Sequence, residues 1–425
     1  MSAEASISAA APKAAIATLM LAVFTVSVGY GVVLPLLPYL IERLLGAGVG
    51  AAQVSRHTGL LTGVYTLALF LFAPIWGRAS DRLGRGNILL IGLFGFGATM
   101  MIFSFVESLT AVYAERFLSG MFAAAVTPVA AAAIGDLATT DQARARWLAF
   151  VSMAGIAGFL LGPMLSVLIS RFAAVFFTTT QPAGSLKIPL SVTALLSILI
   201  GVAIAFAVPR GRHSDHLKKA TIVSVDSNPW VVPTLLVLTF IVSTGIGVFE
   251  VGLALRGKQE LGLTPFQIAL MFSECSLVMF GVQAIVFSPG IKPDITRWLI
   301  SPALAVLAGA LFFVPRASDF ALMLAVVGAV AASAGILSPI LTYWISSKAG
   351  SAQGWELGKQ TAAASLGVTL GSAAGGLLFN VAALQGASFV FAAALAALGF
   401  VLSLRLARVL VTRNFADRAY TSETP

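Results

Sequence analysis

The stretch APIWGRASDRLGRGNILL, residues 73–90, places a group of charges between two long apolar runs. Its charged residues are Arg78, Asp81, Arg82 and Arg85. Gly77 and Gly84 bound the group, and glycine permits tight turns where a larger side chain would clash. We expect a polar loop in which Asp81 caps a helix N-terminus, while Arg82 and Arg85 hold carboxylates or carbonyl oxygens of a neighbouring helix. Because such contacts can break and reform, the loop is predicted to act as a conformational latch. The latch residues are Gly77, Asp81, Arg82, Gly84 and Arg85.

The composition is that of a chain that lies in a membrane. Of its 425 residues, 58% are hydrophobic and only 10% are charged, and the mean hydropathy is +0.96. A soluble domain carries roughly a quarter charged residues, so this chain cannot cover its surface with charge. About 20 apolar residues cross the ~30 Å hydrocarbon core of a bilayer, and runs of that length recur along the whole sequence.

The apolar runs predict twelve membrane-spanning helices and therefore an all-α membrane protein. The spans are Ala14–Leu40, Thr58–Trp76, Ile88–Phe105, Thr110–Ile134, Trp147–Ile169, Ile188–Val208, Trp230–Leu255, Phe266–Phe287, Trp298–Phe313, Phe320–Ile345, Thr361–Val381 and Ser388–Leu410. The longest polar gap, 209–229, divides them six and six. We expect an N-terminal six-helix bundle over 1–208, a cytoplasmic linker over 209–229, and a C-terminal six-helix bundle with a short tail over 230–425.

The distribution of basic residues orients the chain in the membrane. With this span count, most lysines and arginines of the loops fall on the side of the N-terminus. Cytoplasmic loops of membrane proteins carry such an excess, so both termini are predicted to be cytoplasmic. The same excess accounts for the net charge of +9 without a nucleic-acid partner. An alanine- and glycine-rich composition favours a bacterial cytoplasmic membrane, or a membrane derived from it, as the location.

The two halves resemble each other. The segment GFLLGP at 158–163 is matched by GVTLGS at 367–372, and TPVAAAAIGDLATTDQ at 127–142 by SPILTYWISSKAGSAQ at 338–353. Repeated six-span halves are a common construction of secondary transporters, with the substrate near the bilayer midplane between the halves.

Four motifs resemble signatures of the major facilitator superfamily. The charged stretch is similar to the signature of the family's loop between spans two and three. RFLSGMFAA at 116–124 resembles the fourth-span signature, and GFLLGP resembles the fifth. GYGVVLPLLP at 29–38 is similar to the first-span signature of twelve-span drug/proton antiporters. The resemblance implies two pseudo-symmetric six-helix bundles around a central cavity. It also implies a secondary active transporter that works by alternating access, with proton-coupled export of a small amphipathic molecule favoured.

Charged residues within the spans are the candidate coupling sites, because charge inside a bilayer is costly and usually functional. They are Glu115, Arg116, Glu250 and Glu274. By resemblance, Arg116 faces the cavity and assists proton transfer; the alternative is a structural ion pair with Glu115 or with an acidic residue of a loop. A carboxylate in a low-dielectric cavity can take up and release a proton near neutral pH. We expect Glu274 to be the better proton site, since Glu250 has basic neighbours in sequence that could neutralise it.

Small and kinking residues indicate where helices pack closely or move. Small residues three or four apart let helices approach, and proline removes a backbone hydrogen bond. Tight packing alone and sliding at the interface between halves are both open explanations. The candidates for packing or gating are Gly31, Pro35, Pro38, Gly120, Gly158, Gly162, Pro163, Gly367 and Gly371. Candidates for the cavity wall are Tyr30, Tyr65, Tyr343 and Asn380.

Motifs for other classes of function are absent from the sequence. There is no phosphate-binding Gly-Lys-Ser/Thr loop, zinc motif or nucleophile–base pair, so we expect neither an enzyme nor a cofactor or resident metal. The expected partners are a small-molecule substrate, protons and the lipid bilayer, with the protein a monomer. Two alternatives remain. One is uptake or facilitated passage of a small solute or a metal ion such as iron, and the other is a transporter-like receptor or scaffold without flux.

Overall fold

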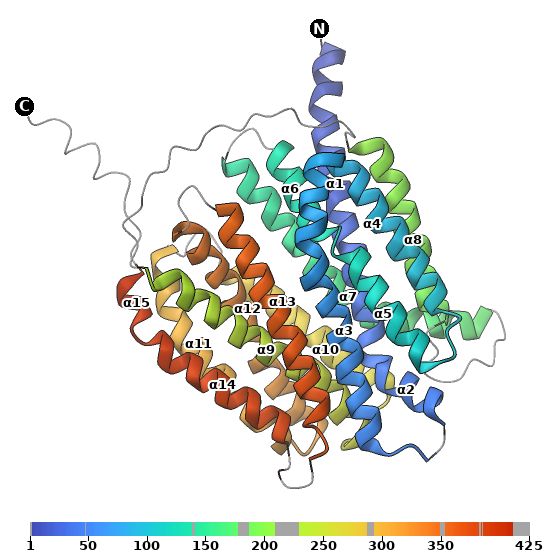
Figure 1. The fold of residues 1–425 in the computed structure, drawn as a ribbon, viewed down its shortest axis with the longest axis vertical. Coiled ribbons are helices and arrows are strands. Elements are labelled where there is room, and N and C mark those ends of the chain that lie inside the picture. Colours follow the sequence, from blue (N-terminus) through green and yellow to red (C-terminus); the bar gives the residue numbers. More distant parts are fainter. Residues whose placement is uncertain are drawn as a thin grey trace, which may run out of the picture.

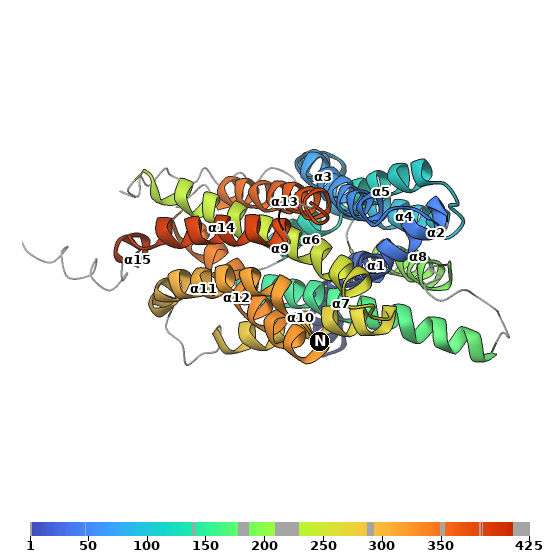
Figure 2. The same cartoon turned by 90° about the horizontal axis from the view of Figure 1, so that it is seen from below.

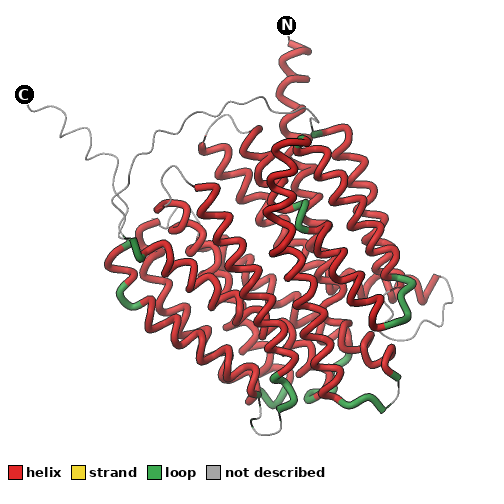
Figure 3. The backbone as a smooth tube through the Cα atoms, viewed as in Figure 1, coloured by secondary structure: helices red, strands yellow, loops and turns green. Residues whose placement is uncertain are grey.

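The computed structural model describes residues 2–46, 48–137, 141–176, 187–208, 229–286, 293–348, 353–381, 384 and 386–410. In these residues the regular elements are helices, drawn red in Figure 3, and no strand occurs. Residues 209–228 of the predicted linker and 411–425 of the predicted tail lie outside the described residues.

The first half contributes the helices drawn from blue to green in Figure 1. They are α1 (Ser2–Val33), η1 (Leu34–Leu36), α2 (Leu37–Leu45), α3 (Ala51–Leu83), α4 (Arg85–Phe103), α5 (Leu109–Ala123), α6 (Thr127–Leu137), α7 (Asp141–Phe176) and α8 (Lys187–Ala207). The first span is interrupted at η1, where Pro35 lacks the backbone N–H that a continuous α-helix needs.

The second half contributes the helices drawn from yellow-green to red. They are α9 (Val231–Gln259), α10 (Pro265–Val286), α11 (Pro293–Phe313), η2 (Val314–Arg316), α12 (Phe320–Lys348), α13 (Gln353–Leu377), α14 (Ala387–Ser403) and α15 (Leu406–Val409). One cluster of buried apolar residues fills α1–α8 and a second fills α9–α15. Tyr30 of α1 packs against both clusters.

The helices account for the twelve predicted spans. Among the described residues, 10 helical segments are long and apolar enough to cross a membrane, and Phe150–Ser166 of α7 is a shorter apolar helix. The helix α13 occupies the place of the eleventh span. The ninth predicted span, the shortest, is part of α11, which has 21 residues. The predicted fold class, all-α with twelve membrane helices, is confirmed.

The internal repeat appears in the packing of the helices. A Cβ atom added to Gly158 of α7 would lie 2.4 Å from the Phe24 carbonyl oxygen of α1. A Cβ atom added to Gly367 of α13 would lie 2.6 Å from the Phe240 carbonyl oxygen of α9. One turn further on, Gly162 and Gly371 approach carbonyl oxygens of the same two partner helices. The α1–α7 pair of the first half is therefore repeated as the α9–α13 pair of the second.

These close approaches lie within each half of the chain, since α1 and α7 both precede the polar gap at 209–229 and α9 and α13 both follow it. Gly120 likewise approaches the Tyr65 carbonyl oxygen inside the first half. The glycines that meet across the halves are Gly59 and Gly376, where α3 crosses α13. In this conformation Gly120, Gly158, Gly162, Gly367 and Gly371 thus pack tightly within a half, and a role for them in gating stays a prediction.

We expect Gly371→Ala to lower the stability by about 1–3 kcal/mol, the usual cost of overpacking. The added methyl carbon would lie 2.2 Å from the Thr244 carbonyl oxygen, so two backbones would have to separate. Gly281→Ala is the matched control, because its Cβ would meet nothing within 4 Å. Thermal unfolding in detergent micelles measures both. Equal transitions for the two variants would contradict the close-packing explanation.

Candidate functional site between the two halves

The helices run between two ends of the molecule (Figure 1). The start of α1 is drawn at one end. We call the opposite end, which carries residues 48–50, 260–264 and 378–381, the far end. Figure 2 views the molecule from that end, with α3 beside α13 and α7 beside α10 where the halves meet. The site described below is formed by these helices together with α1, α9 and α12.

The predicted latch is built around Arg85. Its Nη1 lies 2.5 Å from Asp81 Oδ1, and its Nε donates to Asp136 Oδ2 of α6 at 3.0 Å. The arginine therefore ties the end of α3 to the end of α6, within the first half. Gly84 ends α3 with φ 92°, a value that favours glycine.

Two details of the latch prediction are wrong. Gly77 lies inside α3 rather than in a turn, because the helix continues to Leu83. Asp81 lies in the last turn of α3 and pairs with Arg85, and the start of α4 has no side-chain cap. Arg82 is exposed on the same last turn.

Arg116 is buried in an ion pair within the first half. Its Nε donates to Glu115 Oε2 at 3.0 Å, and its Nη2 donates to Ser119 Oγ at 3.1 Å. Glu115 and Arg116 are each 3% exposed. The guanidinium carbon lies 5.1 Å from the Tyr65 ring centre and 5.0 Å from that of Phe103. In this conformation Arg116 is thus held among α3, α4 and α5 rather than presented to a cavity.

A cavity of about 230 Å³ lies between the two halves. Helices α1 and α7 form one side of it, and α9, α10 and α12 the other. Most of its wall is aliphatic or aromatic, and its one charged group among the described residues is the Glu250 carboxylate. The lining residues are Tyr30, Gly155, Ile156, Phe159, Ile246, Phe249, Glu250, Phe272, Cys275, Ser276, Met279, Val330, Ala331 and Ala334.

A hydrogen bond joins Glu250 to the opposite half. The Tyr30 hydroxyl donates to Glu250 Oε2 at 2.7 Å. The Tyr30 ring stacks on Tyr65 at 5.2 Å and on Phe159 at 5.8 Å, so aromatic contacts fix the position of the hydroxyl. One oxygen of a carboxylate in an apolar cavity is therefore bound to a side chain of the other bundle.

The basic neighbours of Glu250 in sequence are engaged elsewhere. Arg256 pairs with Glu260 and donates to the Ala317 carbonyl oxygen at 2.6 Å. Lys258 pairs with Glu42 of α2. The expected neutralisation of Glu250 by these residues is not found.

Glu274 lies outside the cavity lining. It is on α10, and its Oε1 lies 3.4 Å from the Cβ position of Gly328 on α12. Its Oε2 is buried and has no hydrogen-bond partner among the described residues. The neighbouring Cys275 and Met279 do line the cavity, so α10 presents these two side chains to the cavity and the Glu274 carboxylate to the seam with α12.

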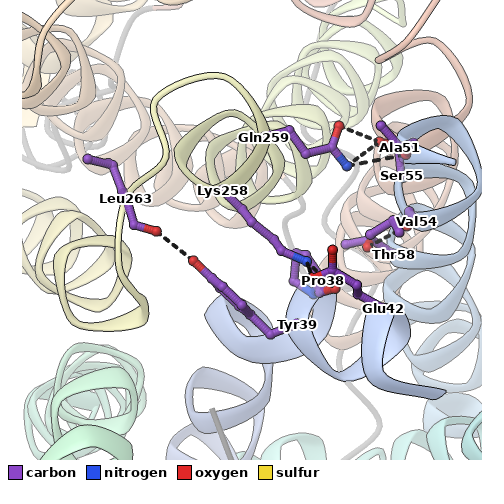
Figure 4. A network of polar contacts seen from close by, with 10 residues as sticks. All are labelled: Pro38, Tyr39, Glu42, Ala51, Val54, Ser55, Thr58, Lys258, Gln259 and Leu263. Carbon is purple, nitrogen blue, oxygen red and sulfur yellow. Dashed lines mark hydrogen bonds and ion pairs between the residues drawn. The ribbon is translucent and has the colours of Figure 1, made fainter. Parts of the chain in front are cut away.

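A polar cluster joins the halves at the far end (Figure 4). Gln259 Nε2 donates to the Ala51 carbonyl oxygen at 3.2 Å, and Tyr39 Oη donates to the Leu263 carbonyl oxygen at 2.6 Å. Asn380 Nδ2 donates to Ser55 Oγ at 2.6 Å. We call the side chains that cross between the halves here the far-end clamp; they are Tyr39, Glu42, Ser55, Lys258, Gln259 and Asn380.

The remaining predicted wall residues lie elsewhere. Asn380 belongs to the clamp, and Tyr65 lies behind Tyr30, in contact with its ring. Tyr343 packs edge-on against Trp344 at 5.4 Å in the second half. Of the four predicted wall residues, Tyr30 alone is among the described lining residues.

A family model described as Major Facilitator Superfamily matches residues 19–355. The chain belongs to the major facilitator superfamily. Multidrug resistance protein 2 of Bacillus subtilis is 25% identical over 369 residues, which are 84% of this chain and 87% of that protein. Quinolone resistance protein NorA of Staphylococcus aureus is 23% identical over 362 residues, 84% of this chain and 88% of the relative. The resemblance to drug/proton antiporters of this superfamily is therefore confirmed.

Solved structures of the superfamily share the fold. A bacterial homologue of the human lysosomal transporter Spinster, inward-facing and unoccupied, aligns with a TM-score of 0.72 and 14% identity, over 94% of this chain and 97% of that one. The human organic anion transporter MFSD10 aligns with a TM-score of 0.67 and 19% identity, over 92% and 99%. This chain is a multi-pass integral membrane protein with a transporter fold.

Several site residues of this superfamily member were missed from the sequence alone. Phe272 and Ser276 share with Cys275 and Met279 a helical spacing that indicates one face of α10, but many faces of an apolar helix look alike. Glu42 and Gln259 lie at helix ends, where polar residues are ordinary. Only the arrangement of the helices shows that they meet.

Proposed function

We propose that the chain exports a small amphipathic molecule across a bacterial cytoplasmic membrane in exchange for protons. The observation that carries the proposal is the Glu250 carboxylate, which lies in an apolar cavity between the halves and has the Tyr30 hydroxyl as its hydrogen-bond partner. The names of the relatives, which refer to multidrug and quinolone resistance, support export of drug-like molecules.

A carboxylate in this setting can bind either a proton or a cationic group, but not both at once. Apolar walls favour an amphipathic ligand, and a few convergent polar groups orient it. When Glu250 is protonated, its charge disappears and the hydrogen bond from Tyr30 loses its charged acceptor. Proton uptake therefore weakens one contact that joins the halves, which is how a proton can alter the conformational equilibrium.

The side from which substrate enters in this conformation is inferred from the far-end clamp and the predicted topology. The clamp joins the halves at the far end, and the excess of basic residues in the loops on the side of the termini predicts that the termini lie in the cytoplasm. We infer that the cavity of this conformation receives substrate from the cytoplasmic side. Release on the other side requires the clamp to open.

The test uses purified protein in liposomes that carry a pH-sensitive dye. A fluorescent lipophilic cation and a quinolone serve as substrates. Saturable substrate flux that moves protons in the opposite direction supports exchange. Flux without proton movement contradicts the coupling, and binding without flux favours a receptor.

We expect Gln259→Ala to open the far end more often. The change removes its hydrogen bonds to Ala51 and Ser55 of the first half, each worth about 1 kcal/mol, so the open population rises about fivefold or more. Cys275, the single cysteine of the chain, reports on this opening because it lines the cavity. The measurement is its labelling rate by a membrane-impermeant maleimide added on the far side.

Gln267→Ala is the matched control for the clamp. Gln267 also lies near the far end, but it accepts hydrogen bonds from Thr264 in its own loop and does not cross between the halves. Its labelling rate should equal that of the wild type. If Gln259→Ala also leaves the rate unchanged, the cluster does not hold the far end closed.

A further inference from the structure

A second cavity of about 410 Å³ lies between α11 and α12, on the second half and away from the interface between the halves. Its lining residues are Val306, Ala310, Phe313, Arg316, Ala317, Leu322, Ala325, Val326 and Ala329. The alanines leave a hollow between the two helices. We call this hollow the α11–α12 groove; the transport proposal makes no use of it.

The groove faces lipid. Val306 is 51% exposed, Phe313 is 55% exposed and Leu322 is 45% exposed, all in helices that the hydropathy places across the membrane. An apolar hollow in this position must be filled, because an empty one forfeits dispersion contacts along its whole wall. In a bilayer the material that adjoins it is acyl chain.

The length of the groove matches one leaflet. Val306 and Arg316 are ten residues apart along α11 and η2, which corresponds to about 15 Å at 1.5 Å per residue. Half of a ~30 Å hydrocarbon core is also about 15 Å. Since the apolar span Ile295–Arg316 ends at Arg316, this residue lies at headgroup level and Val306 lies near the midplane.

Arg316 supplies the charge at the mouth of the groove. Its guanidinium carbon lies 3.9 Å from the Phe312 ring centre, and its Nη1 donates to the Phe312 carbonyl oxygen at 2.6 Å. No ion pair with a carboxylate forms at Arg316 among the described residues. The nearby Asp319 caps α12 instead, by accepting from the Leu322 amide at 2.8 Å. The remaining donors of Arg316 suit a phosphate, which guanidinium binds well.

The loop beside Arg316, between η2 and α12, is held in place. Arg256 of α9 donates to the carbonyl oxygen of Ala317, which is itself a lining residue. The loop between η2 and α12 is therefore fixed to the core of the second half. The groove and its arginine are parts of one preformed surface.

We propose that the α11–α12 groove binds one acyl chain of an anionic phospholipid, whose headgroup phosphate contacts Arg316. The neutral lipid phosphatidylcholine also carries a phosphate, but its choline group cancels the charge. Arg316 therefore gives the site its preference for an anionic headgroup. The apolar hollow holds the acyl chain, whichever headgroup the lipid carries.

The experiment titrates purified, delipidated protein in micelles with phosphatidylglycerol or phosphatidylcholine of identical acyl chains. Bound lipid is counted by native mass spectrometry. We expect phosphatidylglycerol to bind about fivefold more tightly than phosphatidylcholine, because one basic residue beside an anionic headgroup adds about 1 kcal/mol of binding free energy. Arg316→Gln should abolish the preference and leave phosphatidylcholine binding unchanged. Ala325→Phe, which places a ring in the exposed part of the hollow, should weaken both lipids.

Arg56→Gln is the matched control, since Arg56 is another exposed arginine at the far end and does not line the groove. Thermal unfolding confirms that each variant is folded. The proposal is overturned if the wild type shows no preference, if Arg316→Gln keeps it, or if Arg56→Gln loses as much. Because the readout is lipid binding, its outcome is independent of proton-coupled transport.

Discussion

Glu250→Gln is expected to remove the ability of a pH gradient to drive substrate accumulation. Glutamine preserves the shape of the side chain, but it cannot bind and release a proton in alternation with the substrate. For an electroneutral one-for-one exchange, a gradient of one pH unit is equivalent to about 1.4 kcal/mol and sustains about a tenfold substrate ratio. In the variant the ratio should fall to about one, while substrate self-exchange without a gradient continues.

Two matched variants sharpen this experiment. Glu107→Gln changes an exposed carboxylate, and we expect it to keep the tenfold ratio. Glu274→Gln changes the carboxylate at the α10–α12 seam, outside the cavity lining, and should also retain coupling. If Glu274→Gln loses coupling and Glu250→Gln keeps it, the proton site is at the seam and the present assignment is overturned.

Arg116→Ala is expected to destabilise the protein by about 3–5 kcal/mol, the usual cost when one partner of a buried ion pair is removed. Both residues of the Glu115–Arg116 pair are 3% exposed, so the remaining carboxylate would be a buried, uncompensated charge. The packing of the guanidinium against Tyr65 and Phe103 would also be lost. Thermal unfolding in micelles measures the change.

The double variant Glu115→Gln with Arg116→Met separates structure from transport. It removes both charges and keeps comparable side-chain volume, so most of the lost stability should return. If the pair is structural, the double variant also transports. A stable double variant without any proton coupling would instead assign the Glu115–Arg116 pair a direct part in the proton path.

The fold followed from the sequence because its causes are local. Apolar runs of membrane length placed the helices, and the matching segments around Gly158 and Gly367 indicated the internal repeat that the α1–α7 and α9–α13 contacts display. The boundary of α3 was harder to predict. Charge after Trp76 suggested a loop, but residues 77–83 tolerate helix, and the helix ends only where Gly84 takes a positive φ.

The site was harder to predict because it depends on how each helix is rotated. Glu250 and Glu274 are both carboxylates in apolar helices, and the sequence alone favoured Glu274. Rotation of α10 turns Cys275 to the cavity and Glu274 to α12, while α9 turns Glu250 toward Tyr30. Such orientations result from packing over the whole bundle, which no short motif records.

We propose that one carboxylate, Glu250, binds proton and substrate alternately. The most direct measurement is proton release when substrate binds to purified protein in weakly buffered micelles, over a range of pH. Binding linkage is reciprocal, so a substrate that displaces a proton must bind more tightly as the pH rises. At pH values low enough for Glu250 to carry a proton before substrate binds, we predict about one proton released per substrate bound in the wild type and in Glu274→Gln, and none in Glu250→Gln. Equal proton release from the wild type and Glu250→Gln would show that Glu250 is not the site shared by proton and substrate.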